Sequence, residues 1–178
     1  MKIITENEIQ NELNIKLKQQ SGFDVVLYEN NIVNYGFDDE PNFDYCKANN
    51  IPCICIGRNG GTFYVNSGDI AVGYVAKGLD NSFGLSLTDK FVKYLKSKKL
   101  NAILDNNDIL IDGYKVFGWS SHYFTEFDAT LIVCHFTMSV DLERIKNICQ
   151  KPMIKIPKGL TEYKIKTDDI LNFIKNIQ

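Results

Sequence analysis

One short segment of this chain has a local chemistry that leaves little choice of structure. Two apolar runs, residues 107–111 and 114–118, are separated only by Asp112-Gly113. An Asp-Gly pair tolerates positive φ at both central positions of a two-residue turn, the geometry that joins two antiparallel strands tightly. We therefore predict a β-hairpin in which Ile111 pairs with Tyr114.

This pairing brings a cation near an anion. It sets Leu110 opposite Lys115 and Asp108 opposite Phe117. Because side chains alternate along each strand, these four residues are expected to share one face of the sheet. Asp108 and Lys115 are then diagonal neighbours, about 7–8 Å apart at Cα. Such a pair is either a surface ion pair or one half of an active site, and an isolated lysine on a strand is usually solvated.

Length and composition fit a soluble globular protein with one domain over residues 1–178. The chain is 44% hydrophobic and 24% charged, with a formal net charge of −2. Bulk charge therefore predicts no nucleic-acid partner and no membrane surface. No apolar run approaches the roughly 20 residues that span a bilayer, and the N-terminus lacks the apolar block of a signal peptide. We expect a cytoplasmic protein.

The cysteines favour packing over chemistry. There are five of them, an odd number with no CxxC pair: Cys46, Cys53, Cys55, Cys134 and Cys149. Free cysteine is most often a small buried hydrophobe, and this usage indicates a reducing compartment. With only His122 and His135 to complete a ligand set, a zinc site is not expected.

Periodicity along the rest of the chain predicts strands mixed with helices. Apolar spacing indicates helices over 5–19, 42–49 and 89–99, the third capped by Thr88, and two more capped by Asp141 and Thr167. Strands are expected at 23–28, 32–33, 52–56, 62–65, 70–76, 101–105 and 128–140. The run at 52–56 is predicted to be buried, and those at 62–65 and 70–76 to be neighbours. Hairpin-joined strands with interspersed helices make an α+β sandwich the expected fold class.

A glycine-bearing segment, Gly57-Arg58-Asn59-Gly60-Gly61-Thr62, lies between two of these strands. Adjacent glycines let the backbone approach a ligand closely and turn N–H groups toward phosphate or carboxylate oxygens. Taken alone, a glycine pair is more often a plain turn. Asn107-Asp108 is equally unremarkable alone, because both residue types favour turns.

The order and spacing of these features resemble the lipoate–protein ligase family, within the wider biotin/lipoate ligase and octanoyltransferase group. Pro52–Tyr64 is similar to the family's glycine-rich run, and the Asp112–Gly118 hairpin follows a helix and Asn107-Asp108, as in that family. Asp128–Val133 lies where members carry a His-Gly-Thr strand. The resemblance covers about residues 23–150. It implies a biotin/lipoate-ligase-like sandwich of mixed β-sheet with flanking helices.

This resemblance implies an acyl-adenylate mechanism. Lipoate, or a related small-molecule carboxylic acid, attacks the α-phosphate of ATP, and a lysine of a lipoyl acceptor domain takes the acyl group. Lys115 would be the catalytic cation, placed where negative charge builds up. Asp108 would hold the nucleotide and its Mg²⁺, a hard cation that prefers carboxylate oxygen.

The resemblance also implies a set of substrate- and nucleotide-binding residues: Arg58, Gly60, Gly61, Thr62, Asn107, Asp108 and Gly118. An apolar slot for the aliphatic chain would include Tyr64, Val72, Phe117 and Trp119. A role for these side chains in core packing remains an equal alternative.

The chain departs from the family pattern at several positions. The arginine pair is reduced to Gly57-Arg58, Asn59 replaces the first glycine, Val65 stands at a usual histidine, and Asp128-Ala129 replaces His-Gly. Because only 28 residues follow Gln150, we expect any accessory domain to be a separate protein. A degenerate ligase-like binding module for a lipoyl-type ligand, a nucleotide or a protein is the alternative function. A protein with no small-molecule site is a third.

Overall fold

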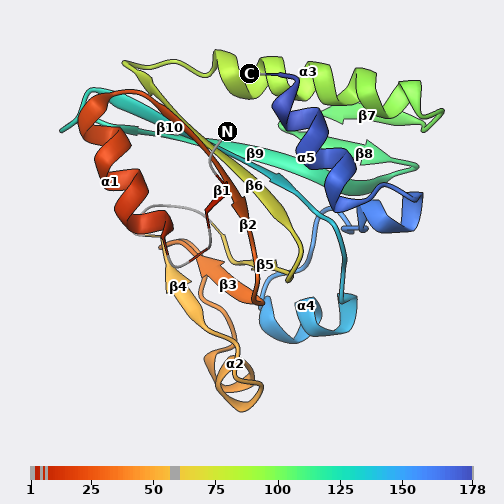
Figure 1. Cartoon of the computed structure of the whole chain (residues 1–178). Helices are drawn as coiled ribbons and strands as arrows, with labels where there is room; N and C mark the ends of the chain where they lie inside the picture. The colour runs from red at the N-terminus through yellow and green to blue at the C-terminus, as the bar shows by residue number, and fades with distance from the viewer. Residues whose placement is uncertain (1–2, 5, 7, 57–60, 178) are drawn as a thin grey trace.

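The protein is built on a seven-stranded sheet, which we describe from a computed structural model (Figure 1). The structure describes residues 3–4, 6, 8–56 and 61–177. The strand order is β1 (Ile3–Ile4), β2 (Gly22–Leu27), β6 (Ile70–Lys77), β10 (Ala129–Phe136), β9 (Tyr114–Phe124), β8 (Asp108–Ile111) and β7 (Ala102–Asp105). Among the described strands of this sheet, β1 and β2 pair in parallel and the other neighbours are antiparallel, so the sheet is mixed, as the sequence predicted.

The two faces of this sheet are covered by different elements (Figure 1). On one face α3 (Ser82–Ser97) and α5 (Thr167–Lys175) bury the largest core cluster, which includes Phe91, Phe136 and Phe173. The other face packs against α1 (Ile9–Gln19) near one end. Strand β10 shows why both faces are filled. Ile132, Cys134 and Phe136 enter the large cluster, whereas the alternate residues face the opposite way.

A second, three-stranded sheet lies on the face that α1 leaves open. Its order is β4 (Cys53–Cys55), β3 (Ile32–Tyr35) and β5 (Phe63–Val65). Val65 of β5 and Ala71 of β6 share one apolar cluster between the sheets. Two short helices, α2 (Phe43–Ala48) and α4 (Leu142–Ile148), pack together beside the small sheet. A 3₁₀ turn, η1 (Leu160–Tyr163), precedes α5.

Three sequence expectations about these elements are wrong. The run at 52–56 is not buried: β4 is an edge strand on which Ile54 is 45% exposed. The strands β5 and β6 are not neighbours, because they belong to different sheets. Thr88 does not begin a helix. It lies inside α3, which starts at Ser82, and its hydroxyl donates to the Gly84 carbonyl at 2.7 Å.

The predicted hairpin is present, with one change of register. Asp112 and Gly113 have φ of 51° and 85°, and Ile111 pairs with Tyr114 as expected. A β-bulge then shifts the pairing, so that Ile109 faces Phe117 and Asp108 faces Gly118. The expectation that Asp108 faces Phe117 is therefore wrong. A bulge adds one residue to one strand, and here Val116 and Phe117 are both completely buried.

Of the two other predicted helix caps, Asp141 is confirmed and Thr167 is wrong, because Thr167 is already the first residue of α5. Asp141 accepts from the Arg144 N–H at 2.9 Å and caps α4. In α5 the cap position is Lys166, whose N–H donates to Asp169. Within the described part of the chain, no helix combines the length and the apolar character needed to cross a bilayer.

Candidate active site

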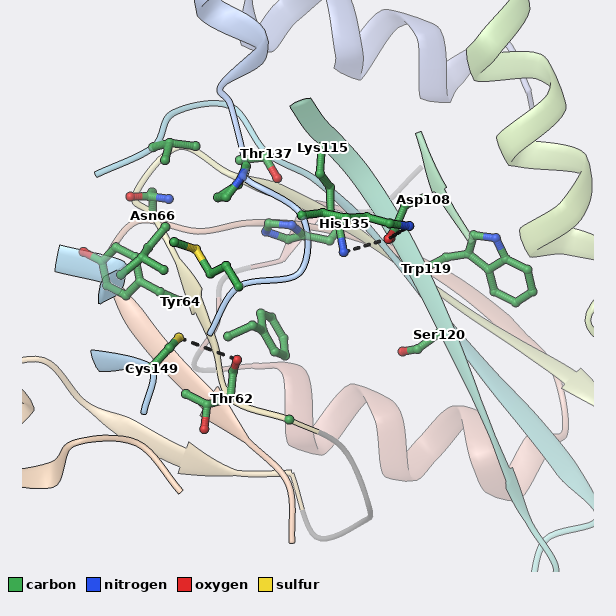
Figure 2. Close-up of a pocket in the computed structure, with 18 of the residues that line it drawn as sticks. Thr62, Tyr64, Asn66, Asp108, Lys115, Trp119, Ser120, His135, Thr137 and Cys149 are labelled. Carbon is green, nitrogen blue, oxygen red and sulfur yellow. Dashed lines mark hydrogen bonds and ion pairs between the residues drawn. The ribbon is translucent and has the colours of Figure 1, made fainter. Parts of the chain in front are cut away.

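A cleft of about 370 Å³ opens between the two sheets (Figure 2). Its walls come from β5, from the facing surface of β9 and β10, and from the chain between α4 and η1. Five of the predicted catalytic and substrate-binding residues line this cleft: Gly61, Thr62, Asp108, Lys115 and Gly118. The fold thus brings the end of the glycine segment to the same cavity as the hairpin.

The Lys115 ammonium and the Asp108 carboxylate meet at one wall of the cleft. Lys115 Nζ lies 2.8 Å from Asp108 Oδ1, and the two side chains are 38% and 19% exposed. Both side chains lie on one side of the sheet, because Asp108 and Leu110 share a face of β8 and Leu110 pairs with Lys115. The expected cation–anion pair is therefore confirmed, although the bulged register differs from the predicted one.

Gly118 is needed by this ion pair. A Cβ at this position would lie 2.6 Å from Asp108 Oδ1 and 3.0 Å from Lys115 Nζ. Atoms that are not bonded to each other are almost never that close, so any side chain would displace the pair. The absent side chain makes the space in which the ammonium sits.

Asp108, Gly118 and His135 form one row across β8, β9 and β10. Gly118 pairs with Asp108 on one side and with His135 on the other. Directly opposed residues of antiparallel strands share a face, so His135 points into the same cleft, as Figure 2 shows. The Lys115 ammonium fills the gap that Gly118 leaves in this row.

His135 lines the cleft and lies beside the buried Asp69, and the sequence reasoning assigned neither of them to the site. Asp69 is completely buried and its carboxylate accepts from the N–H groups of Asn66 and Met138 at 3.0 and 2.7 Å. His135 Nε2 lies 3.3 Å from Asp69 Oδ2 without a well-aligned hydrogen bond. The available signal was the strand alternation, because a histidine between Cys134 and Phe136 must face away from the core.

Lys155 is the second cation that the sequence reasoning missed. Its ammonium lies 2.8 Å from Asp108 Oδ2 and 2.9 Å from Asp105 Oδ2. The two oxygens of Asp108 therefore contact different lysines. Burial pushes the pKa of Asp108 up, but hydrogen bonds from Lys115 and Lys155 outweigh it and leave that pKa below its ordinary value. Asp108 is an anion at neutral pH.

The remaining predicted residues lie in different places. Arg58 and Gly60 are outside the described residues. Asn107 is exposed in the turn before β8 and does not line the cleft. Thr62 lines the cleft, but its hydroxyl donates to the Asp39 carbonyl at 2.9 Å, so it also fixes the loop before α2.

Two residues of the predicted apolar slot border the cleft and two do not. Tyr64 and Trp119 line the cleft, whereas Val72 and Phe117 are completely buried in the core beneath α3 and α5. Figure 2 shows the Trp119 ring turned away from the cleft, and it packs on Gly84 of α3, where a Cβ would meet the ring at 2.6 Å. Other apolar residues complete the wall: Phe63, Val133, Val140, Ile145 and Met153.

Cys149 lies at the cleft but lacks the surroundings of a nucleophile. Burial raises the pKa of the thiol, and the nearby Asp39 carboxylate raises it further. A reactive cysteine needs the opposite, a lowered pKa. The sulfur lies 3.8 Å from the Thr62 carbonyl oxygen. Its geometry favours packing at a helix end, in agreement with the sequence interpretation.

The arrangement at Asp108 does not fit a magnesium ion held by the protein. Both carboxylate oxygens contact lysine ammonium groups. In the described ranges, no three His, Cys, Asp or Glu side chains come together as a metal site. Magnesium needs oxygen ligands in a nearly octahedral set, and a neighbouring ammonium opposes a second cation.

The family is decided by the sequence as a whole. Residues 9–173 match the model of the lipoyl protein ligase A/B catalytic domain. The chain belongs to this family. Among curated proteins, none matches the sequence of this chain.

Solved structures agree with the family through the fold. A bi-partite lipoate protein ligase from Thermoplasma acidophilum, studied with its E2 lipoyl domain, is 18% identical and has a TM-score of 0.76. The match covers 98% of this chain and 80% of that one. Protein Ta0514 of T. acidophilum with bound lipoic acid is 17% identical with a TM-score of 0.75, covering 98% and 82% of the two chains. A lipoate-protein ligase A bound with ATP is 16% identical with a TM-score of 0.70, covering 96% and 79%. At such identities the likeness shows the lipoate/biotin-ligase catalytic fold, an α+β fold as expected.

Proposed function

We propose that this lipoyl ligase family member activates lipoate, or a closely related acid, with ATP and transfers the acyl group to a lysine of a lipoyl domain. The observation that carries the proposal is the Lys115–Asp108 pair, held over Gly118 in a cleft that the glycine segment also borders. Structural relatives crystallised with lipoic acid and with ATP support the choice of substrates.

In the first step, a carboxylate oxygen of the acid attacks the α-phosphorus of ATP and pyrophosphate leaves. Negative charge grows on the phosphate oxygens as the new bond forms. A fixed cation in a partly buried site stabilises that charge without having to reorganise. Lys115 supplies this cation, and Asp108 holds its ammonium over Gly118.

In the second step, the neutral amine of the acceptor lysine attacks the acyl carbon. The bond from that carbon to the AMP oxygen breaks, AMP leaves, and the new amide nitrogen loses one proton. The apolar wall that includes Val133, Val140 and Met153 would receive the aliphatic chain. We propose that magnesium enters with the ATP phosphates, since the Asp108 arrangement does not fit a bound ion.

The partners follow from the same proposal. A structural relative was studied together with its E2 lipoyl domain and is described as bi-partite. We therefore propose a lipoyl domain as acceptor and a separate accessory-domain protein as a second partner.

The test is a lipoylation assay. Purified protein, ATP, lipoate and an unmodified lipoyl domain are incubated with and without the accessory protein, and the lipoyl domain is weighed by intact mass spectrometry. We expect a mass gain of one lipoyl group that depends on ATP and is lost in Lys115→Met. Lys93→Met is the matched control, because Lys93 lies on α3 and pairs with Asp89 on the helix surface. Thermal stabilisation by lipoate and ATP without any product, in every mixture, would favour the binding module instead.

A further inference from the structure

Lys155 reaches the Asp108 carboxylate from a part of the chain far away in sequence. It lies between α4 and η1, 47 residues after Asp108. Its ammonium bridges Asp108 Oδ2 at 2.8 Å and Asp105 Oδ2 at 2.9 Å, and it also donates to the Asp105 carbonyl at 3.1 Å. With a side chain only 21% exposed, Lys155 is a fixed part of the cleft wall.

The backbone directly after Lys155 is hydrogen-bonded to β9. The Lys115 N–H donates to the Ile156 carbonyl at 2.9 Å, and the Lys158 N–H donates to the Lys115 carbonyl at 2.9 Å. The two bonds form a parallel bridge beside Pro157. Lys115 and Lys155 are therefore positioned by one local backbone pairing, which brings two ammonium groups to one carboxylate.

Two negative charges surround Lys155, and a divalent cation would balance the same charge. Two carboxylates, Asp105 and Asp108, converge on a single cationic centre, and that centre is an ammonium. Hydrogen bonds with Asp108 are the largest influence on the Lys155 side chain and raise its pKa. The ammonium therefore stays charged at neutral pH.

We propose that Lys155 takes the place of a metal ion at Asp108, so that the cleft binds its anionic ligand through two lysines and without metal on this carboxylate. The identity of that anion as ATP rests on the proposed function. Lys115 and Lys155 both line the cleft. An incoming phosphate can share their N–H donors, and hydrogen bonds between charged groups are the stronger kind.

The first arm of the test uses Mn²⁺ alone and needs no catalysis. Electron paramagnetic resonance follows Mn²⁺ binding to the wild type and to Lys155→Met, which removes the ammonium and keeps the length of the side chain. We expect the wild type to bind no Mn²⁺ at this site and Lys155→Met to gain a site that a second change, Asp108→Asn, removes. Equal binding of Mn²⁺ by the wild type and by Lys155→Met overturns the proposal.

In the second arm, isothermal titration calorimetry measures the affinity for ATP in the presence of EDTA. We expect Lys155→Met to weaken binding about tenfold or more and Lys155→Arg, which keeps the charge, to remain within about threefold of the wild type. Lys158→Met is the matched control on the same segment, because that side chain lies over the rings of Tyr114 and Tyr163. Circular dichroism checks that each variant folds.

The outcomes separate the two proposals. Unchanged ATP affinity in Lys155→Met while the lipoylation assay succeeds overturns the role of Lys155 and leaves the proposed function standing. A failed lipoylation assay counts against the proposed function, and the Mn²⁺ arm still decides whether Lys155 replaces the metal.

Discussion

At the scale of single residues, the site depends on what Gly118 lacks. Its missing Cβ leaves the space in which Lys115 and Asp108 meet. The sequence could place these three residues near one another because they lie on one short hairpin, where local pairing rules apply. It could not place Lys155, because a contact across 47 residues is set by how α4 and the chain after it pack.

Gly118→Ala is the sharpest single change at the ion pair. The added methyl would lie 2.6 Å from Asp108 Oδ1 and push Lys115 aside. We expect lipoyl transfer to fall about 100-fold, because small misplacements of a catalytic group have large effects. The free energy of unfolding should change by about 1 kcal/mol or less, since flexible side-chain ends can move. Ser121→Ala, at an exposed position on the same strand, should alter neither quantity, and a fully active Gly118→Ala would refute the role given to this glycine.

Asp69 supports the site through the backbone. Its buried carboxylate joins the turn before β6 to the chain after β10 by accepting from the N–H groups of Asn66 and Met138. Asp69→Ala leaves both donors unpaired, so we expect it to lower the free energy of unfolding by about 3 kcal/mol. Urea unfolding measures this loss. Asp89→Ala, which breaks the surface pair with Lys93, is the control and should cost less than about 1 kcal/mol.

The Asp108 ion pairs predict a dependence of stability on pH. They hold the pKa of Asp108 below its ordinary 3.8 in the folded state. The stability that they contribute is therefore complete above that ordinary pKa and is lost as pH falls through the lowered, folded-state pKa. In urea unfolding from pH 6 downward, we expect the wild type to be more stable than Asp108→Asn at pH 6 and this difference to shrink below pH 3.8. A difference that grows with acid would contradict the assignment.

At the scale of elements, the hairpin of β8 and β9 was predictable and its bulge was not. The Asp112-Gly113 turn is a local signal and gave the correct pairing of Ile111 with Tyr114. The bulge follows from packing, because Val116 and Phe117 are adjacent and both are completely buried. If side chains alternated strictly along β9, one of these two side chains would face the cleft.

The start of α3 was also not predictable from local sequence. Gly84 lowers helix propensity in a region where the sequence predicted no helix, yet the helix runs through it from Ser82. The reason is tertiary, because the Trp119 ring of β9 occupies the space beside Gly84. Helix propensity describes only the local sequence, so it contains no information about the Trp119 ring of β9.

The positive φ of Gly113 makes the hairpin turn sensitive to substitution. Gly113 has φ of 85°, a conformation that costs a β-branched residue about 1–2 kcal/mol. Gly113→Val should therefore lower the free energy of unfolding by that amount, measured by urea unfolding. Asp112→Asn is the control, because asparagine tolerates the φ of 51° at this position. Equal stability of both variants with the wild type would show that the turn does not hold the hairpin.

At the scale of the whole molecule, two sheets enclose the cleft and each supplies one part of it. The large sheet brings Asp108, Lys115 and His135, the small sheet brings the end of the glycine segment, and the chain after α4 adds Lys155. The sequence indicated the α+β class and the family. The division into two sheets was not readable, because β5 and β6 are consecutive strands that do not pair.

The most direct test of the central claim isolates the first chemical step. Pyrophosphate release from ATP is measured with lipoate present and no acceptor domain, in the wild type, in Lys115→Met and in Lys93→Met. We expect release that depends on lipoate in the wild type and in Lys93→Met, and a loss of at least about 100-fold in Lys115→Met. Release at the wild-type rate by Lys115→Met would contradict the central claim.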